Sequence, residues 1–523
     1  MKTDLRQVQQ FAQSGRFPEM LVACQKIIAN DNLDTLLDIG VLLFNFGFLT
    51  VARECFYRAR RLAPNDLRPL VNLANLAREA GNHAKSRHLY GELLERLPDQ
   101  PVIRRNVLAS LEYDNDVTDA ERLAHAQAWG RWAIAKAGGE RPRPPPRPLD
   151  GCPLRVGYVS ADFCQHTVGL FVKDALKAHD PAQVLTFVYS AGWVSDWVTD
   201  FIRAACQFRD VVALDDAALA DLIRQDGIDV LVDLSGHTGG SRLTVFACRP
   251  APLQVSWLGY FATTGLTCMD AVLLDDWHAP PGTEAQFVEP IVRLPLGRFC
   301  YQPVTWAPAD VAPPPCLSNG VVTFGSFNNT AKCNAAVFDA WAQILIAVPD
   351  ARLILKWRTF QDAGLCQSVR DEFAQRGVDP ARLELRGASF HVDVLKEYAD
   401  IDIALDPFPF AGGLTSCEAL WMGVPVITWP QSRVVSRQTL AFLSAIGGGL
   451  QELAAKDAAD YIHIAQTLAA DPARLSTLRA TLRRTMQASP LMDVAGFTRQ
   501  LEATYRDLYQ TIQTKEETQG HAP

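Results

Sequence analysis

The sequence predicts an all-α repeat region followed by two α/β lobes, each built on a mostly parallel sheet. The first 137 residues carry helical patterns with a 34-residue period. Short apolar runs then alternate with helical patterns twice, over residues 153–312 (lobe 1) and 313–510 (lobe 2). Such alternation is typical of parallel sheets covered by helices. A Pro- and Arg-rich linker, residues 138–152, separates repeats from lobes, and residues 511–523 form a polar tail.

The repeat period can be read from paired glycines and prolines. Gly47 and Gly81 are 34 residues apart, and so are Pro64 and Pro98. A small residue between two helices and a proline closing the second helix is the tetratricopeptide pattern. Stacked helix pairs of this kind either hold a peptide on a concave surface or pack on a neighbouring domain. The sequence leaves both alternatives open.

Composition excludes several classes of protein. A net charge of −8 argues against a nucleic-acid partner, and no apolar run approaches the roughly 20 residues that cross a bilayer. The twelve cysteines include no CxxC pair, which argues against a zinc site or a disulfide framework. The DxD at 400–402 overlaps the start of a buried strand, so no metal site is predicted there. With no signal pattern at the N-terminus, we expect a cytoplasmic protein that binds neither nucleic acid nor membrane.

The stretch IDIALDPFPFAGGLTSCEALWMGVPVITW, residues 401–429, contains a strand, a glycine turn, a helix and a second strand. Gly412 and Gly413 allow the tight turn, and the spacing of Thr415 and Glu418 predicts a capping box at the helix start. Such a helix start after a strand is where phosphates bind. The alternative is an ordinary capped helix.

Polar residues after the predicted strands are candidates for chemistry. His166 in SADFCQHTVG and His237 in DLSGHTGGSR follow strands of lobe 1, where a histidine transfers protons or holds an oxygen. In lobe 2, GSFNNTAK supplies Asn329 and Lys332, which suit a phosphate or a base, and RGASFHVD supplies His391 at a helix start.

Five segments together resemble the catalytic region of the O-linked N-acetylglucosamine transferase family, which includes the plant SPINDLY-like proteins and bacterial members. They are LRVGYVSADFCQH, DGIDVLVDLSGHTGGSR, CRPAPLQVSWLGYFATTGL, GSFNNTAK and LDPFPFAGGLTSCEALWMGVPVIT. The resemblance covers most of residues 153–510. It implies a GT-B architecture, two Rossmann-like lobes with a nucleotide sugar between them. It also implies an inverting, metal-independent protein glycosyltransferase without a cofactor, which transfers N-acetylglucosamine from UDP-N-acetylglucosamine to Ser or Thr.

The resemblance implies a donor-binding set in lobe 2. Lys332 matches the lysine that contacts the donor diphosphate, and Asn329 stands in place of a nearby glutamine. Thr415 matches a threonine that binds the diphosphate at a helix start, and Ser416 beside it belongs to the same set. Glu418 matches the acidic residue that holds the ribose hydroxyls. The physical chemistry agrees, because an ammonium and a helix N-terminus both stabilise a departing diphosphate.

The resemblance also implies a catalytic set. His166 matches the histidine proposed as a base, His237 lies in the matching glycine-flanked loop, and Lys332 stabilises the leaving group. Where animal members carry Lys and His three residues apart, this chain has His391 and Val394. His391 therefore enters the predicted donor-binding set, and either it does both jobs or diphosphate binding is weaker. The acceptor proton goes to His166 or to the phosphate oxygens, and the sequence does not decide between them.

These departures keep alternatives open. The same fold also serves donors and acceptors of other kinds, GDP-fucose for O-transfer or UDP-glucose for N-transfer to Asn. A repeat scaffold with weak catalysis is a further alternative. The expected partners are a nucleotide sugar and a protein or peptide acceptor, which the helical repeats could bind.

Overall fold

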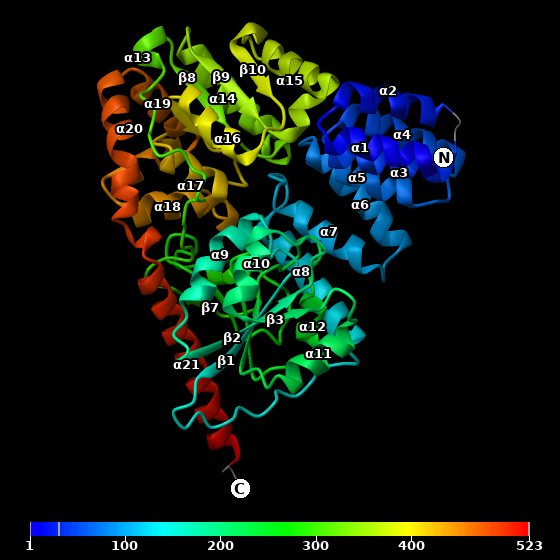
Figure 1. Ribbon diagram of the computed structural model, residues 1–523, viewed down its shortest axis with the longest axis vertical. Helices are drawn as coiled ribbons and strands as arrows, with labels where there is room; N and C mark the ends of the chain where they lie inside the picture. The colour runs from blue at the N-terminus through cyan, green and yellow to red at the C-terminus, as the bar shows by residue number, and fades with distance from the viewer. Residues whose placement is uncertain (1, 30–31, 521–523) are drawn as a thin grey trace.

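The computed structural model describes residues 2–29 and 32–520 and shows a helical array beside two α/β lobes (Figure 1). The array, in blue, packs against lobe 2, and lobe 1 lies below both in this view. Helix α21 at the C-terminus runs from lobe 2 down along lobe 1. Among the described residues, no helix has both the length and the apolar character required to cross a bilayer.

The array consists of antiparallel helix pairs, which confirms the predicted helical repeat region. The turns at Gly47 and Gly81 both have positive φ, of 83° and 74°, so glycine suits them. Apolar faces of successive helices form one continuous core that includes Leu36, Phe56 and Leu93. Its helices are α1 (Lys2–Gln13), α2 (Phe17–Ile28), α3 (Leu33–Asn45), α4 (Leu49–Leu62), α5 (Arg68–Glu79), α6 (His83–Arg96), α7 (Pro101–Leu111) and α8 (Asp119–Lys136).

Lobe 1 is a parallel sheet with strand order β3-β2-β1-β4-β5-β6-β7, the Rossmann order, extended by one strand. Its strands are β1 (Leu154–Ser160), β2 (Val184–Ser190), β3 (Gln207–Asp210), β4 (Val230–Asp233), β5 (Leu253–Trp257), β6 (Ala271–Leu274) and β7 (Ile291–Arg293). Its helices are α9 (Thr167–Ala178), α10 (Trp197–Ala205), α11 (Asp216–Gln225) and α12 (Leu243–Ala247). The sequence missed β3 because this edge strand is polar and largely exposed, so no apolar run marks it.

Lobe 2 repeats this order as β10-β9-β8-β11-β12, again with parallel pairing. Its strands are β8 (Thr323–Ser326), β9 (Arg352–Lys356), β10 (Leu383–Arg386), β11 (Ile403–Leu405) and β12 (Val426–Ile427). Its helices are α13 (Cys316–Asn319), α14 (Ala335–Ala347), α15 (Ala363–Gln375), α16 (His391–Glu397), α17 (Leu414–Trp421), α18 (Gln438–Ile446), α19 (Ala458–Ala469) and α20 (Pro472–Gln487). The predicted pair of doubly wound lobes is confirmed.

Short 3₁₀ helices lie between these elements, and one of them, η2, carries Lys332. They are η1 (Thr283–Gln286), η2 (Thr330–Lys332), η3 (Arg358–Gln361), η4 (Pro380–Arg382), η5 (Tyr398–Asp400), η6 (Val434–Arg437), η7 (Leu450–Leu453) and η8 (Pro490–Met492).

The array is fastened to lobe 2 by close backbone approach and by buried polar contacts. Thr50 donates its N–H and its hydroxyl to the carboxylate of Asp362, both at 2.7 Å. His83 Nε2 lies 2.8 Å from the carbonyl oxygen of Ala331, in η2. A Cβ at Gly81 would collide with a lobe 2 carbonyl oxygen. Of the two alternatives left by the sequence, packing on the neighbouring domain is therefore realised for this face of the array.

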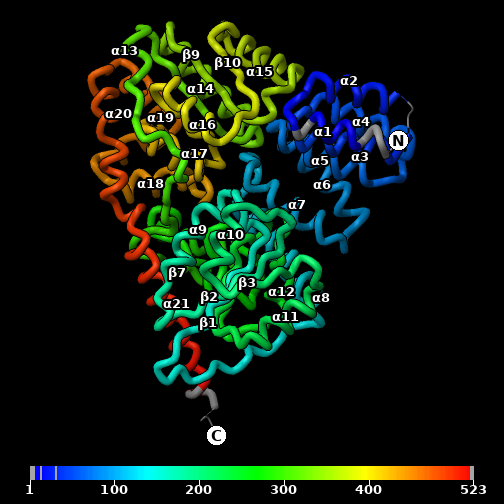
Figure 2. Tube along the Cα trace, viewed as in Figure 1, coloured from blue at the N-terminus to red at the C-terminus, as the bar shows by residue number. Residues whose placement is uncertain are grey.

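The Pro- and Arg-rich linker is anchored to lobe 1 by ion pairs of its arginines. The guanidinium of Arg147 pairs with the buried carboxylate of Asp229 at 2.7 Å, and Arg143 pairs with Asp270 at 2.6 Å. The segment runs along the lower end of lobe 1 toward α21 (Figure 2), where Gln513 donates to the carbonyl oxygen of Arg147.

Helix α21 (Val494–Gly520) fastens the two lobes together. Glu502 accepts hydrogen bonds from the backbone N–H of Asp180 at 2.8 Å and from His179 Nδ1 at 3.0 Å, both in lobe 1. Tyr505 is fully buried against lobe 1. The helix continues through 511–520, part of the polar tail that the sequence predicted; residues 521–523 lie outside the described residues.

Candidate functional site

A cavity of about 730 Å³ lies where the array, lobe 1 and lobe 2 meet. Its lining includes six of the residues singled out from the sequence: His166, Asn329, Lys332, His391, Thr415 and Glu418. The array adds Ala109, Glu112 and Tyr113 to the same wall. The predicted donor-binding residues other than Ser416 thus line one cavity.

The Rossmann order of both sheets explains this convergence. In each sheet the strand order reverses beside the first strand, and ligands bind at the carboxyl ends of the strands on either side of that point. His166 follows β1 in lobe 1, and Lys332 follows β8 in lobe 2. Thr415 comes after β11, the strand that pairs with β8. Helices α9 and α17, which follow β1 and β11, lie at the boundary between the lobes (Figure 1).

Lys332 presents its ammonium to the cavity from a partly buried position. Nζ donates to the side-chain oxygen of Asn328 at 3.1 Å and to the carbonyl oxygen of Ala411 at 2.9 Å. In the described part of the chain, no carboxylate lies within ion-pair distance of this nitrogen, and the nearest negative charge that acts on it belongs to buried Asp406. Burial lowers the pKa of Lys332 to about 8. The ammonium donates to two neutral acceptors and keeps a third hydrogen, so it can bind an anion in the cavity.

The start of α17 lies beside this ammonium. Thr415 Oγ1 donates to the same Asn328 oxygen, at 3.2 Å. Within the described chain, the backbone N–H groups of Leu414 and Thr415 have no acceptor. A helix start with free N–H groups attracts negative charge. Lys332 and α17 therefore form one electropositive corner.

The predicted capping box at this helix is wrong. Helix α17 starts at Leu414 with Gly413 as its N-cap, and no side chain caps it. Thr415 thus lies inside the first turn, where its hydroxyl reaches Asn328 instead of a helix N–H. Glu418 does not reach back to the helix start; it is buried and bonds to His391.

The Glu418–His391 pair joins the middle of α17 to the start of α16. His391 Nε2 lies 2.7 Å from Glu418 Oε1, and His391 Nδ1 has no partner among the described residues. The hydrogen bond that His391 donates to Glu418 raises the pKa of His391. Glu418 thus has one oxygen engaged and one left for a hydroxyl donor at the cavity wall.

His166 lies across the cavity from Lys332, at the start of α9. It is the N-cap of that helix, and its Nδ1 accepts from the N–H of Val168 at 3.4 Å. Asp162 Oδ1 lies 3.7 Å from the same nitrogen. The side chain is about half exposed, so an incoming group can reach the free Nε2 edge.

His237 and Ser416, both predicted for the site, do not line this cavity. His237 is 1% exposed, and Nε2 bonds to the carbonyl oxygen of Thr264 at 2.9 Å. Its ring packs edge-on against Trp129 and Tyr260, and burial lowers its pKa to about 3. Ser416 is also buried, and its hydroxyl bonds to Thr439 at 2.9 Å. The glycines that flank His237 predicted a ligand site, whereas in the structure this histidine is tightly packed.

Comparison with known proteins adds the family. The pattern of glycosyl transferase family 41 matches residues 144–301 and 315–501. This chain belongs to glycosyl transferase family 41. A mutant of the Thermobaculum terrenum O-GlcNAc transferase superposes on it with a TM-score of 0.88 at 35% identity, over 98% of both chains. The match confirms the GT-B architecture with its helical array.

Curated relatives of this family 41 chain include plant proteins. The probable UDP-N-acetylglucosamine–peptide N-acetylglucosaminyltransferase SPINDLY of Petunia hybrida is 38% identical over 427 residues, 79% of this chain and 44% of the relative. The protein called SEC from Arabidopsis thaliana, with the same enzyme name, is 30% identical over 361 residues, 67% of this chain and 36% of the relative. The chain spans about half the length of the curated relatives it matches, or less.

Several cavity residues of this family 41 chain escaped the sequence reasoning. Asn328, beside the predicted Asn329, is the acceptor that joins Lys332 to Thr415, whereas Asn329 caps η2 through the N–H of Ala331. Both asparagines line the cavity, and the doubled residue in the sequence does not tell which one bonds to Lys332. Tyr113 comes from the array, and no local pattern predicts a contact with a site more than 200 residues away.

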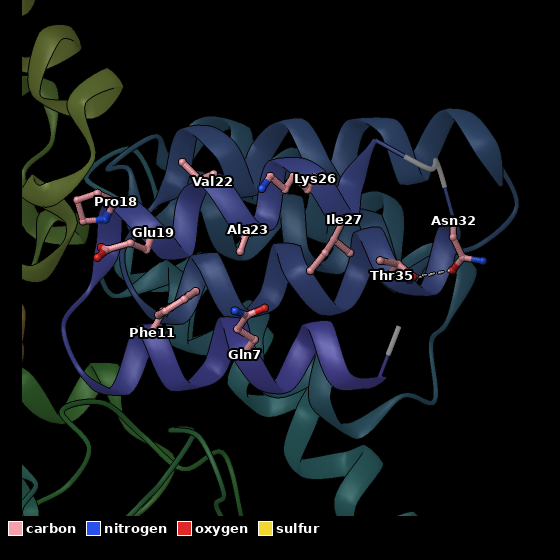
Figure 3. A pocket seen from close by; sticks show the side chains of 10 residues that line it. All are labelled: Gln7, Phe11, Pro18, Glu19, Val22, Ala23, Lys26, Ile27, Asn32 and Thr35. Atoms are coloured by element: carbon pink, nitrogen blue, oxygen red, sulfur yellow. Dashed lines mark hydrogen bonds between the residues drawn. The ribbon is translucent and has the colours of Figure 1, made fainter.

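The array of this family 41 chain also has a hollow of its own, about 720 Å³ in volume, between its first helices (Figure 3). Phe11 on α1 and Ile27 on α2 line it together with Gln7, Glu19 and Lys26. This surface lies apart from the face that packs on lobe 2. It keeps the peptide-binding alternative open for the outer repeats.

Proposed function

We propose that this family 41 chain is an inverting, metal-independent protein glycosyltransferase that transfers N-acetylglucosamine from UDP-N-acetylglucosamine to Ser or Thr. One observation carries the proposal: Lys332 and Thr415 share the side-chain oxygen of Asn328 at the wall of one cavity, beside the free start of α17. The names of the plant relatives supply the donor and the peptide acceptor. The donor is a substrate, and the proposal includes no cofactor.

The reaction requires stabilisation of a leaving diphosphate. As the bond from the sugar C1 to the β-phosphate oxygen breaks, negative charge gathers on the phosphate and positive charge on the sugar ring. The Lys332 ammonium and the N–H groups at the start of α17 are already in place for that charge, so little reorganisation is needed. Their fixed positive charge supports a mechanism without a metal.

We propose a direct displacement by the acceptor oxygen, which inverts the configuration at C1. The described carboxylates that line the cavity are Glu112 and Glu418, and both are engaged, Glu112 with Arg122 at 2.8 Å and Glu418 with His391. Neither is proposed as the nucleophile for a covalent sugar intermediate, because Glu112 is held by Arg122 and Glu418 is assigned to the donor ribose. The acceptor hydroxyl forms the new bond to C1, and its proton passes to His166 or to an oxygen of the departing diphosphate.

The proposed acceptor is a protein segment that reaches the cavity between array and lobes. The array supplies part of the cavity wall, and its hollow between α1 and α2 offers apolar and charged side chains to a longer peptide. Glu418 is proposed to hold the donor ribose through its remaining oxygen, and His391 is proposed to orient that carboxylate.

The test is a transfer assay with the purified full-length chain. Incubation with UDP-N-acetylglucosamine and lysate proteins should release UDP and add one N-acetylhexosamine mass to Ser or Thr peptides. Lys332→Ala should lower the rate by about 10²- to 10³-fold or more, because the leaving charge loses its cation. Lys396→Ala is the matched control, since that exposed lysine on α16 pairs with Asp393 outside the cavity.

Other outcomes separate the alternatives. Turnover with GDP-fucose or UDP-glucose in place of UDP-N-acetylglucosamine would keep the enzyme class and change the donor. Modification on Asn would change the acceptor. Lys332→Ala with a rate near that of the unaltered chain would contradict the mechanism.

A further inference from the structure

The three parts of the molecule meet at one aromatic ring, that of Phe410. This residue follows β11 in the loop that leads to α17. Tyr113 from the array stacks on it, with ring centroids 4.4 Å apart and planes 23° apart. Phe261 from lobe 1 meets it edge-on at 5.8 Å. The Lys332 ammonium lies 4.8 Å from the centre of the same ring.

The array holds Tyr113 in a fixed direction. Tyr113 lies in the turn after α7, and its neighbours are anchored on both sides. Glu112 is buried and pairs with Arg122 of α8 at 2.8 Å, and Asp114 pairs with Arg87 of α6. The imidazole of His83 stacks on Tyr113 from the array side, at 5.8 Å between ring centres. This imidazole also bonds to the carbonyl oxygen of Ala331, next to Lys332.

We propose that Tyr113 is a positioning residue through which the helical array fixes the Lys332 ammonium at the cavity wall. The tyrosine ring holds Phe410, and the Phe410 ring covers one side of the ammonium. The array thereby reaches the electropositive corner without contacting Lys332 itself. The inference rests on the proposed function only for the identity of the anion that the ammonium binds.

Two features of Tyr113 favour a role beyond packing of the array. Its ring lines the cavity, and its hydroxyl has no hydrogen-bond partner among the described residues, so the array does not require the polar end. The Phe410 ring lies 4.8 Å from the Lys332 ammonium and shields this charge from water on one side. Removal of the Tyr113 ring frees Phe410 to tilt and lets water reach Lys332.

The protonation of Lys332 reports on this contact directly. Burial lowers the pKa of Lys332 to about 8, and Asp406 opposes that effect. Two titratable groups act on it directly, Asp406 after β11 and Cys333 beside it in sequence. The titratable groups on the same cavity wall or stacked behind it include Glu112, Tyr113, His83, His166, His391 and Glu418. Tyr113→Phe removes only the phenol hydroxyl and leaves every other group in place, so its Lys332 midpoint can be compared directly with that of the unaltered chain.

The experiment follows the titration of Lys332 in the full-length chain by NMR of ¹³Cε-labelled lysine, with the signal assigned by its loss in Lys332→Arg. In Tyr113→Ala we expect the midpoint to rise by about one pH unit, because desolvation of the ammonium is relieved. Tyr113→Phe keeps the ring and should titrate like the unaltered chain. Tyr57→Ala, which alters an array tyrosine that bonds to Lys85 and does not line the cavity, is the control for general loosening.

UDP binding by calorimetry at pH 7 is the second readout. Tyr113→Ala should weaken UDP affinity by about tenfold, whereas Tyr113→Phe and Tyr57→Ala should not. An unchanged Lys332 midpoint in Tyr113→Ala would overturn the inference, and so would an equal shift in Tyr113→Phe or in Tyr57→Ala. Should Tyr113→Ala fail to fold, Tyr113→Leu replaces it, because leucine keeps a large apolar side chain but cannot stack on Phe410. The Lys332 midpoint is then measured in that variant. If the unaltered chain bound no UDP while the Lys332 midpoint shifted as expected, the proposed function would fail and the positioning role would stand.

Discussion

Asn328 organises the cavity at the scale of single residues. Its side-chain oxygen accepts from the Lys332 ammonium and from the Thr415 hydroxyl, so it fixes the direction of both groups without a charge of its own. A carboxylate here would neutralise the ammonium and oppose an anionic ligand. The amide therefore keeps the corner electropositive, which a diphosphate requires.

His391 and Glu418 allow a prediction about pH. The hydrogen bond that His391 donates to Glu418 raises the pKa of His391 in the folded chain, so the pair stabilises the fold most below the unfolded pKa of histidine, near 6.5. That stability is lost as pH rises through the folded pKa. A glutamine at position 391 makes the same contact without a charge. We therefore expect the difference in unfolding free energy between the unaltered chain and His391→Gln to be about 1 kcal/mol larger at pH 6 than at pH 9.

Thermal unfolding of both proteins across this pH range measures the difference. His463→Gln is the control, since this histidine on α19 has no resolved carboxylate partner in the described chain. A difference between unaltered chain and His391→Gln that stays constant from pH 6 to 9 would contradict the pairing.

At the scale of elements, the sequence predicted long apolar patterns well and polar features poorly. The strand at Leu154–Ser160 lies where its apolar run placed it, because buried strands of a parallel sheet carry continuous apolar residues. The capping box failed because Thr415 and Glu418 have stronger tertiary partners in Asn328 and His391. The spacing of two residues does not show which hydrogen-bond partner each side chain takes in the folded chain.

The turns of the array allow a matched test of docking. Gly81 and Gly15 both have positive φ, of 74° and 71°, but only a Cβ at Gly81 would collide with lobe 2, at the carbonyl oxygen of Cys333. Gly15→Ala should cost about 1 to 2 kcal/mol from backbone strain alone. Gly81→Ala should cost about 3 kcal/mol or more, because the array must also move away from η2.

Limited proteolysis of the turns between array helices, together with thermal unfolding, measures both effects. Gly81→Ala should expose the array to cleavage, and Gly15→Ala should not expose the turns that pack on lobe 2. Equal behaviour of the two variants would show that the array is not held by this contact.

At the scale of the whole molecule, the site is assembled from parts that are distant in sequence. The meeting of Lys332 and Thr415 was predictable, because carboxyl ends of neighbouring parallel strands lie at one edge of a sheet. The contribution of Tyr113 was not predictable, because it depends on how the array docks on lobe 2. Helix α21 makes a similar long-range contact through Glu502 to lobe 1.

The central claim is that one ammonium and one helix start cradle a diphosphate between the lobes. Calorimetric titration of UDP into the unaltered chain, Lys332→Ala and Lys396→Ala tests it most directly. We predict one UDP bound per chain, with affinity lowered about tenfold or more in Lys332→Ala and unchanged in Lys396→Ala. UDP that bound equally well to all three proteins, or to none of them, would contradict the account.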